Sequence, residues 1–435
     1  MRRCQGAGIA LVTIGMALAA PAQAQTFQEE VVRLLDTHPE IKAERARTDA
    51  TNAGVDEALG AFLPRIDLSA SNAYAVIDSP SRRSAAGEPY RGDIKKATLT
   101  ITQNLFDGFL KDGNLLSAKA NYQAAGHVYT RVQQTTLLRG IRAYLDVLRQ
   151  TRLAVIAREN ENNLQTQLSL EDERVKRGSG LTVDVLAAKS RLQIAKEQRV
   201  AIEGALKNAI SLYARAFGAA PDLGAMDEPP NPSGSLPATK EEAIRFARKG
   251  SPLILERDSQ IAAARGAREA AWSGYFPKID LVGSVNYEED AEGTLGPKRD
   301  GRIMVQLSWN LYAGGSTTAA VRRTSANLSA SMYALNVVDR AVIEEVEREW
   351  QNMETAAERV ALLENAVNIA AEVLDARTKL RAAGKESAIN VLDSESELNF
   401  ARINHEIALF EAKTARYRLL NAMGRLTPTA IGVVY

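Results

Sequence analysis

Cysteine is almost absent from this 435-residue chain, which contains only Cys4. A lone cysteine cannot form an internal disulfide, and Cys4 lies in a segment that we expect to be removed. The three histidines, His38, His127 and His405, are far apart and share no metal-ligand spacing. The sequence therefore predicts no thiolate metal site, no cysteine nucleophile and no cofactor.

Excess charge and long apolar runs are missing too. The chain has 54 Lys and Arg residues against 53 Asp and Glu, a formal net charge of +1, so no large basic face points to a nucleic-acid partner. Beyond residue 24 there is no run of 18 apolar residues. A membrane crossing would therefore have to use β-strands, because lipid admits only helices and closed barrels.

Sequence signatures of enzymes are also lacking. There is no G-x-S-x-G nucleophile motif, and Gly178-x-Gly180 lacks the third glycine and the preceding strand of a phosphate loop. The acidic run Glu288-Glu289-Asp290 could hold calcium, but a solvated surface loop is the better interpretation. We expect that the chain is not an enzyme.

The first 24 residues have the pattern of a secretory signal peptide. Arg2 and Arg3 form a charged start, residues 9–19 are apolar, and Ala22-Gln23-Ala24 is a small-x-small cleavage site. The alternative, a membrane anchor, is disfavoured because the apolar run is far shorter than the roughly 20 residues of a spanning helix.

One short motif occurs twice and organises the rest of the chain. Phe62-Leu63-Pro64-Arg65-Ile66-Asp67-Leu68 returns as Tyr275-Phe276-Pro277-Lys278-Ile279-Asp280-Leu281. Each copy ends a helical pattern and begins an alternation of apolar and polar residues. The alternating runs are about ten residues long, the length of a tilted strand that crosses a bilayer. The predicted hairpin strands are residues 66–76 and 96–105, then 279–287 and 303–311.

Most of the remaining chain predicts helices, at residues 27–62, 110–176, 181–217, 240–276, 317–382 and 386–422. Pro39 and Pro252 should each break the first helix of a half, because proline fits only the first turn of a helix. The Pro- and Gly-rich residues 220–239 predict a linker between two structural repeats, residues 25–219 and 240–435. Residues 78–93 and 288–300 predict exposed loops.

The two repeats share a register, which supports one unit used twice. Gly178 and Gly384, like Gly218 and Gly424, are 206 residues apart. A helix of about 65 residues is roughly 100 Å long, and two helices of about 35 residues placed end to end match it. The predicted shape is a long helical pillar with β-hairpins at one end and helix-turn-helix tips at the other.

Four strands cannot close a barrel, and lipid does not tolerate open sheet edges. We hypothesise that three copies pool their hairpins into twelve strands, an even number of transmembrane size. Five aromatic residues near the strand ends would then lie at the membrane interface: Tyr74, Phe106, Tyr287, Trp309 and Tyr312. The alternative is an ordinary soluble sheet in which these aromatics pack a core.

The duplicated order of helix, proline, strand, loop, strand, long helix, glycine and helix resembles the TolC family of outer-membrane efflux and secretion channels. The motifs that carry this resemblance are Pro64-Arg65-Ile66-Asp67-Leu68, Asp184-Val185-Leu186 and Asn390-Val391-Leu392-Asp393. The resemblance implies a homotrimer with a twelve-stranded β-barrel in the outer membrane, in contact with its lipid. A long α-helical barrel would continue the duct through the periplasm.

The resemblance also implies a function and partners. The chain would be the exit duct of a tripartite efflux or type I secretion system. It would dock through a periplasmic membrane-fusion adaptor onto an inner-membrane pump of the ABC or RND type. The duct would pass small toxic compounds or polypeptides to the outside, and the sequence does not distinguish between these cargoes.

By the same resemblance, carboxylates just after the helical tips form a ring that narrows the periplasmic entrance. Asp393 takes one such position, Asn390 takes the other, and Asp184 is the first-half equivalent of Asn390. Glu386 stands where the family has an arginine that holds the entrance closed, so the closed-state contacts must differ here. The alternative is that both acids are exposed residues of a first helical turn, stabilised by the helix dipole.

The tips themselves resemble the adaptor-docking turns of the family. They lie at residues 174–181 and 381–388 and include Arg174, Gly178, Gly180, Leu181 and Gly384. Plain helix termination would explain the glycines equally well. A periplasmic coiled-coil scaffold or adaptor without a pore also remains open, although the two matching hairpins of strands favour a channel.

Overall fold

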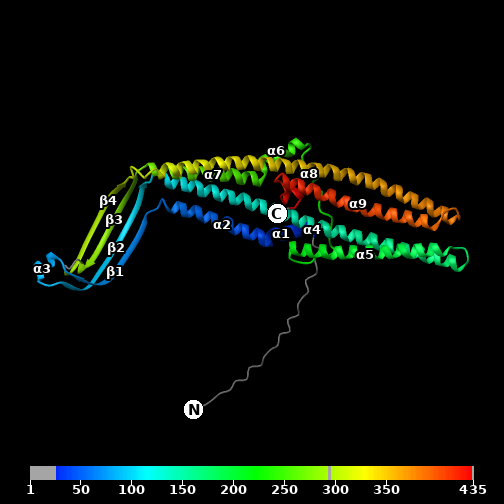
Figure 1. The fold of residues 1–435 in the computed structure, drawn as a ribbon, viewed down its shortest axis with the longest axis horizontal. Coiled ribbons are helices and arrows are strands. Elements are labelled where there is room, and N and C mark those ends of the chain that lie inside the picture. Colours follow the sequence, from blue (N-terminus) through cyan, green and yellow to red (C-terminus); the bar gives the residue numbers. More distant parts are fainter. Residues whose placement is uncertain (1–25, 292–294, 434–435) are drawn as a thin grey trace, which may run out of the picture.

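The computed structural model describes residues 26–291 and 295–433, so the expected signal peptide lies outside the described residues. The molecule is a long bundle of helices with a four-stranded sheet at one end (Figure 1). Each half of the chain contributes one pair of strands and one hairpin of long helices. The prediction of a mainly helical fold with a small strand part, built on a duplicated plan, is confirmed.

Two helices of 67 residues each form the body of the bundle: α4 (Leu110–Lys176) and α8 (Ser316–Ala382). At 1.5 Å per residue each is roughly 100 Å long. Each turns at the end far from the sheet into a helix about half as long, α5 (Thr182–Phe217) or α9 (Ala388–Ala422). In the described part of the chain, no helix is both long enough and apolar enough to cross a membrane.

The helices nearer the sheet are interrupted where the sequence places Pro39 and Pro252. Helices α1 (Phe27–Thr37) and α2 (Pro39–Gly60) meet at His38, and α6 (Lys240–Gly250) and α7 (Pro252–Trp272) meet at Ser251. Each proline occupies the first position of its helix, where a backbone N–H has no intrahelical partner to lose. Helix α7 then ends in a short 3₁₀ turn, η2 (Ser273–Tyr275), before the sheet begins.

The sheet is an antiparallel meander in the order β1 (Arg65–Ile77), β2 (Tyr90–Phe106), β3 (Lys278–Glu289) and β4 (Pro297–Ser308). The hairpin ladders continue well into the segments expected to be loops, down to the pair Ile77 and Tyr90. The prediction of a continuous loop at residues 78–93 is wrong. Ser79 and Pro80 there begin a short helix, α3 (Pro80–Ala86), because Ser79 caps it and proline suits its first turn.

The second hairpin is also displaced from its expected bounds. Strand β4 begins at Pro297 and ends at Ser308, so Trp309 and Leu311 lie beyond it rather than within it. Alternation of apolar and polar residues continues past the last ladder bond, so the pattern alone places the end of the strand too late. The side-chain N–H of Trp309 instead donates to the carbonyl of Tyr275 at 3.2 Å, at the junction with the helices.

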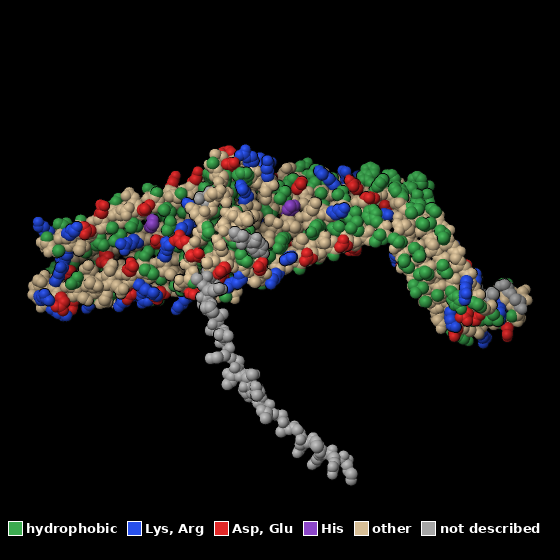
Figure 2. All heavy atoms as spheres, turned by 180° about the vertical axis from the view of Figure 1, so that it is seen from behind, with side chains coloured by type: hydrophobic (Ala, Val, Ile, Leu, Met, Phe, Trp, Pro, Cys, Tyr) green, Lys and Arg blue, Asp and Glu red, His purple; other side chains and the backbone are tan. Residues whose placement is uncertain are grey.

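The register of the sheet sorts its side chains onto two faces. Leu68, Leu99 and Val285 are paired across three strands and share one face, whereas Asp67, Thr100 and Ser284 share the other. The apolar face is not covered by any other described part of the chain: Leu68 is 74% exposed and Ile303 is 82% exposed. Figure 2 shows hydrophobic side chains crowded over this end of the molecule.

The largest apolar core lies where the ends of the shorter helices meet, near the middle of the long ones. It includes Phe27, Tyr144, Tyr213, Phe217 and Leu420, all buried. The residues between α5 and α6, numbers 218–239, cross the helices at this level, and we call them the equatorial strap. The sequence predicts a linker at residues 220–239, which form most of this strap.

Polar contacts fasten the equatorial strap to the helices. Tyr144 donates its hydroxyl to the carbonyl of Asp227 at 2.9 Å, and the carboxylate of Asp227 accepts the backbone N–H of Phe27 at 3.0 Å. Further along the strap, Tyr417 donates to the carbonyl of Pro230 at 2.5 Å. The strap therefore ties α1, α4 and α9 together.

Candidate functional site

The two helical tips are built in the same way. Gly178 follows the end of α4 and Gly384 follows the end of α8, each with a positive φ, +76° and +72°. At each tip the backbone N–H groups of this glycine and of the next residue bond back to carbonyls three and five residues earlier, at 2.9–3.0 Å. This closing motif needs a left-handed residue, which glycine adopts without strain.

Gly180 allows the first tip to fold back tightly. A Cβ added there would lie 2.8 Å from the backbone nitrogen of Val175. Next to it, Leu181 is 68% exposed and Val183 is 64% exposed. The first tip is therefore a compact turn with apolar side chains on its surface.

Asp184, one of the expected entrance carboxylates, is buried rather than open to solvent. It lies in the first turn of α5 and is 6% exposed. Arg381, near the end of α8, donates to Asp184 at 3.4 Å and to Glu171 at 2.9 Å. Arg174 also donates to Glu171, at 2.8 Å, so two guanidinium groups balance the two buried carboxylates. Of the two, Arg381 ties the first helical hairpin to the second.

Asp393 makes the complementary contact from the second hairpin. It is exposed on α9 and accepts from Arg191 of α5 at 2.5 Å. The two expected carboxylates are therefore not side by side within one chain. Each is an acceptor in a separate contact between the two hairpins.

Glu386 and Asn390 lie together in the second tip. The Asn390 amide donates to the carboxylate of Glu386 at 2.5 Å, and the Ser387 backbone N–H donates to it at 3.0 Å. These hydrogen bonds hold the pKa of Glu386 below its usual value, the Asn390 bond contributing most. Arg377 donates to the carbonyl of Asn390 at 3.0 Å. This cluster braces the turn within one hairpin.

Sequence reasoning missed the cations of these contacts: Arg191, Arg377 and Arg381. No spacing along the chain points to Arg191 or Arg381, because each bonds to a carboxylate of the other hairpin, about 200 residues away.

A buried polar group lies about two turns after the start of α9. Glu395 is 7% exposed, and one of its carboxylate oxygens has no hydrogen-bond partner among the described residues. Burial raises the pKa of Glu395 to about 6. One turn on, Asn399 donates to Gln198 of α5 at 3.4 Å. The seam between the hairpins therefore contains a carboxyl whose pKa lies well above its usual value.

The whole arrangement defines a class of protein. An amphipathic sheet whose apolar face is left uncovered by the described residues, carried on a helical bundle roughly 100 Å long, is the design of an outer-membrane channel with a periplasmic extension. The chain belongs to the outer membrane efflux protein family, whose pattern matches residues 31–218 and 243–425.

Similar proteins agree with this family. The chain is 25% identical over 413 residues to the outer membrane efflux protein BepC of Brucella suis biovar 1, covering 95% of this chain and 88% of that one. It is 24% identical over 428 residues to the outer membrane protein TolC of Escherichia coli K12, covering 93% and 85%. A membrane protein of Pseudomonas aeruginosa has the same fold, with a TM-score of 0.80 at 17% identity over 91% and 93% of the chains.

The resemblance to the TolC family is thus confirmed. The protein is an outer-membrane efflux duct, with its sheet at the membrane and its helices in the periplasm. The family consists of transport channels rather than enzymes. Within residues 26–291 and 295–433, no group of three or more His, Cys, Asp or Glu side chains could hold a metal ion.

Proposed function

We propose that three copies of the chain assemble into one duct, each contributing its four strands to a twelve-stranded barrel. The observation that carries this proposal is the sheet. Among the described residues its outer strands, β1 and β4, each pair on one side only, and its apolar face is exposed. In a bilayer, strand edges must pair and apolar faces must meet lipid, and a trimer satisfies both requirements.

Aromatic side chains support the same placement. Phe106, Phe109 and Phe276 pack edge to face at the junction of sheet and helices, with ring centroids 5.6–6.4 Å apart. Tyr312, four residues after the end of β4, is 85% exposed. Such a belt is typical of the membrane–water interface of a barrel.

Disulfide trapping would test the assembly. With Cys4 replaced by serine, Ser69→Cys in β1 can be combined with a cysteine at Arg302, Met304 or Gln306 in β4, all on the polar face. We expect oxidation to join three chains covalently for at least one pair. Ser69→Cys alone is the control. Protein that stays monomeric and gives no conductance in a planar bilayer would instead favour the scaffold without a pore.

We further propose that the tips form the gate of the duct. Asp184 and Asp393 would hold the closed state through Arg381 and Arg191. Glu386 and Asn390 would brace the second tip. The support is that both ion pairs link different hairpins, so that the hairpins cannot separate without breaking them. In the trimer, three copies of each contact would surround the periplasmic entrance.

Single-channel conductance tests the gate. Asp393→Arg should raise the open probability, because it places two cations together, and adding Arg191→Glu should restore closure by re-forming the pair with reversed charges. A double variant whose open probability stays as high as that of the single variant would contradict a closing role for the pair of Asp393 and Arg191. If Asp184→Ala with Asp393→Ala leaves cation block unchanged, these carboxylates do not form the constriction.

The tips would also receive the periplasmic membrane-fusion adaptor, which connects the duct to an inner-membrane pump of the ABC or RND type. Arg174, Gly178, Gly180, Leu181 and Gly384 build these turns, and the exposed Leu181 offers an apolar contact. Cysteines at Ser179 and Lys385 should cross-link to the adaptor in cells. Cross-links that form only from mid-helix positions would contradict docking at the tips. The cargo would be small toxic compounds or polypeptides.

A further inference from the structure

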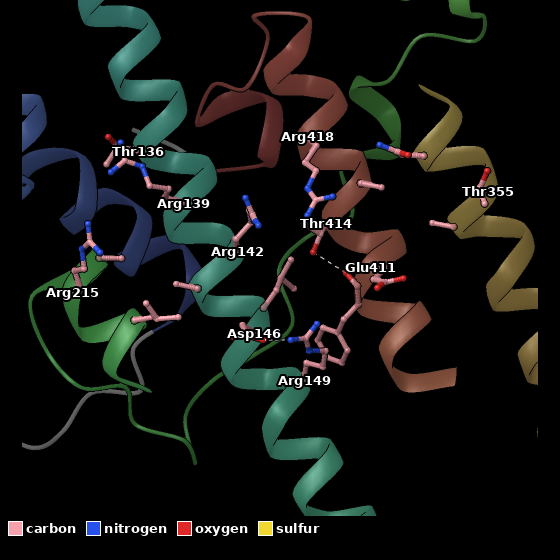
Figure 3. A pocket seen from close by; sticks show the side chains of 18 of the residues that line it. Thr136, Arg139, Arg142, Asp146, Arg149, Arg215, Thr355, Glu411, Thr414 and Arg418 are labelled. Carbon is pink, nitrogen blue, oxygen red and sulfur yellow. Dashed lines mark hydrogen bonds and ion pairs between the residues drawn. The ribbon is translucent and has the colours of Figure 1, made fainter. Parts of the chain in front are cut away.

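The helical body contains a cavity of about 910 Å³ that the gate and the docking turns do not use. It lies near the middle of the molecule, between α4, α5, α8 and α9 (Figure 3). Six arginines line it, against three carboxylates. The arginines are Arg139, Arg142, Arg149, Arg215, Arg359 and Arg418, and the carboxylates are Glu40, Asp146 and Glu411.

Each of the three carboxylates is taken by one arginine. Glu40 accepts two hydrogen bonds from Arg139, at 2.7 and 2.9 Å, and Glu411 accepts from Arg359 at 2.6 Å. Asp146 pairs with Arg149. Three arginines are left over, and among the described residues no hydrogen bond or ion pair engages Arg142, Arg215 or Arg418.

Two of the unpaired guanidinium groups reach into the same gap. Figure 3 shows Arg142, on α4, and Arg418, on α9, extending into the space between these two helices. Arg418 is half-buried, so its charge is partly withdrawn from water. Arg142 is exposed, and an anion between the two guanidinium groups would offset their mutual repulsion.

The rest of the lining is suited to an apolar body. Leu145 and Ala415, both buried, come from the same two helices, and Ala143 lies beside them. Guanidinium groups bind carboxylates, sulfonates and phosphates through paired, charge-assisted hydrogen bonds. A cavity of this size with an apolar wall and a few convergent charges is typical of a small-molecule site.

We infer that this cavity binds organic anions, with the acidic group held by Arg142 and Arg418 and the apolar body against Leu145 and Ala415. The equatorial strap contacts a different face of the same helices. On α9, Lys413 and Tyr417 bond to the strap, whereas Thr414 and Arg418 line the cavity. In the trimer proposed above, on which this step rests, the bulk of the strap must lie outside the duct. The cavity then opens onto the duct, as a wall site for anionic cargo.

Calorimetric titration of the purified full-length protein in a neutral detergent tests the site. The probe is naphthalene-2-sulfonate, compared with uncharged naphthalene-2-methanol and with inorganic sulfate. We expect saturable binding of the sulfonate that weakens as salt is added. In the variant Arg142→Gln with Arg418→Gln, the dissociation constant should rise at least tenfold. Arg402→Gln, an exposed arginine of α9 outside the cavity, is the control and should bind like the native chain.

Three results would overturn the inference: no saturable binding to the native chain, equal binding by the double variant and the native chain, or sulfate binding as tightly as the sulfonate. The single variants Arg142→Gln and Arg418→Gln replace the double variant if its thermal midpoint falls. Binding to purified protein needs neither a pump nor conduction. A negative result would therefore leave the proposed duct intact, whereas loss of conductance with binding retained would separate the two.

Discussion

At the residue scale, the charges of the tips act mainly between hairpins. Asp184 is buried against Arg381 and Glu171, and removing one partner of such a group leaves an uncompensated buried charge. Asp393 and Arg191 are more exposed, and screening by water makes their pair weaker. We therefore expect Arg381 to matter more for the packing of the tips than Arg191.

Glu395 gives the clearest pH dependence. Its pKa is raised to about 6 in the folded chain, above its unfolded value, so folding favours the protonated form. The stability that this group contributes is therefore present at low pH and is lost as pH rises from about 4.5 to about 6. Glu395→Gln should stabilise the protein by about 1–2 kcal/mol at pH 7.5 and by almost nothing at pH 4.

Thermal unfolding at the two pH values checks this prediction. Glu397→Gln is the matched control, because Glu397 is on the same helix and exposed. Glu397→Gln should leave the difference in stability between pH 7.5 and pH 4 unchanged. An equal gain from both variants, or a gain for Glu395→Gln that does not depend on pH, would show that burial of the charge is not the cause.

At the element scale, the ends of the short helices meet with little space between them. Gly424, which closes α9 with a φ of +70°, touches the junction of α6 and α7: a Cβ there would lie 2.7 Å from the carbonyl oxygen of Gly250 and 2.7 Å from the Cδ of Pro252. Helices α9 and α7 therefore follow each other along α8 (Figure 1). Gly218 occupies the equivalent position after α5, with a φ of +79° and no atom within 4 Å of the added carbon.

This difference makes the two glycines a matched pair. Gly218→Ala should cost about 1 kcal/mol, the strain of a left-handed alanine, whereas Gly424→Ala should cost about 2–4 kcal/mol, because it also overlaps backbone. The measurement is the shift of the thermal midpoint for each variant. Equal shifts of the thermal midpoint would mean that the close contact between α9 and α7 does not contribute to stability.

At the scale of the whole molecule, the two faces of the sheet decide where the protein resides. Val305 and Gln306 are neighbours in β4, but Val305 lies on the apolar face and Gln306 on the polar face. Val305→Lys should lose about 2 kcal/mol or more of insertion energy, and Gln306→Lys close to none. The fraction of protein recovered as folded oligomer in the outer membrane measures this. Similar recovery of both variants would contradict the assignment of the faces.

Much of this fold could be predicted from the sequence, because its determinants are local. The prolines predict the helix breaks at Pro39 and Pro252, and the alternation of apolar and polar residues predicts the two faces of the sheet. The ends of α4 at Lys176 and of α8 at Ala382 follow from the glycines behind them. The ends of the strands were predicted less accurately. The hydrogen-bonded ladders extend into segments whose residues predict loops, so that β2 begins at Tyr90 and β4 at Pro297.

The candidate site was only half visible in the sequence. Asp184 and Asp393 could be selected because they stand at fixed distances after a helical turn. Their partners Arg381 and Arg191 could not, since each comes from the other hairpin, about 200 residues away in the chain. The arginines of the central cavity were missed for the same reason: they are scattered over four helices, and no spacing along the chain joins them.

The sequence by itself determined the secondary structure, the duplication and the family, because helix periodicity, strand alternation and the positions of proline and glycine act over a few residues. Only the tertiary structure decided that Asp184 is buried, that the linker is a strap and that unpaired arginines converge on one cavity. These features depend on which helices lie side by side, and that is set by packing between segments far apart in the chain.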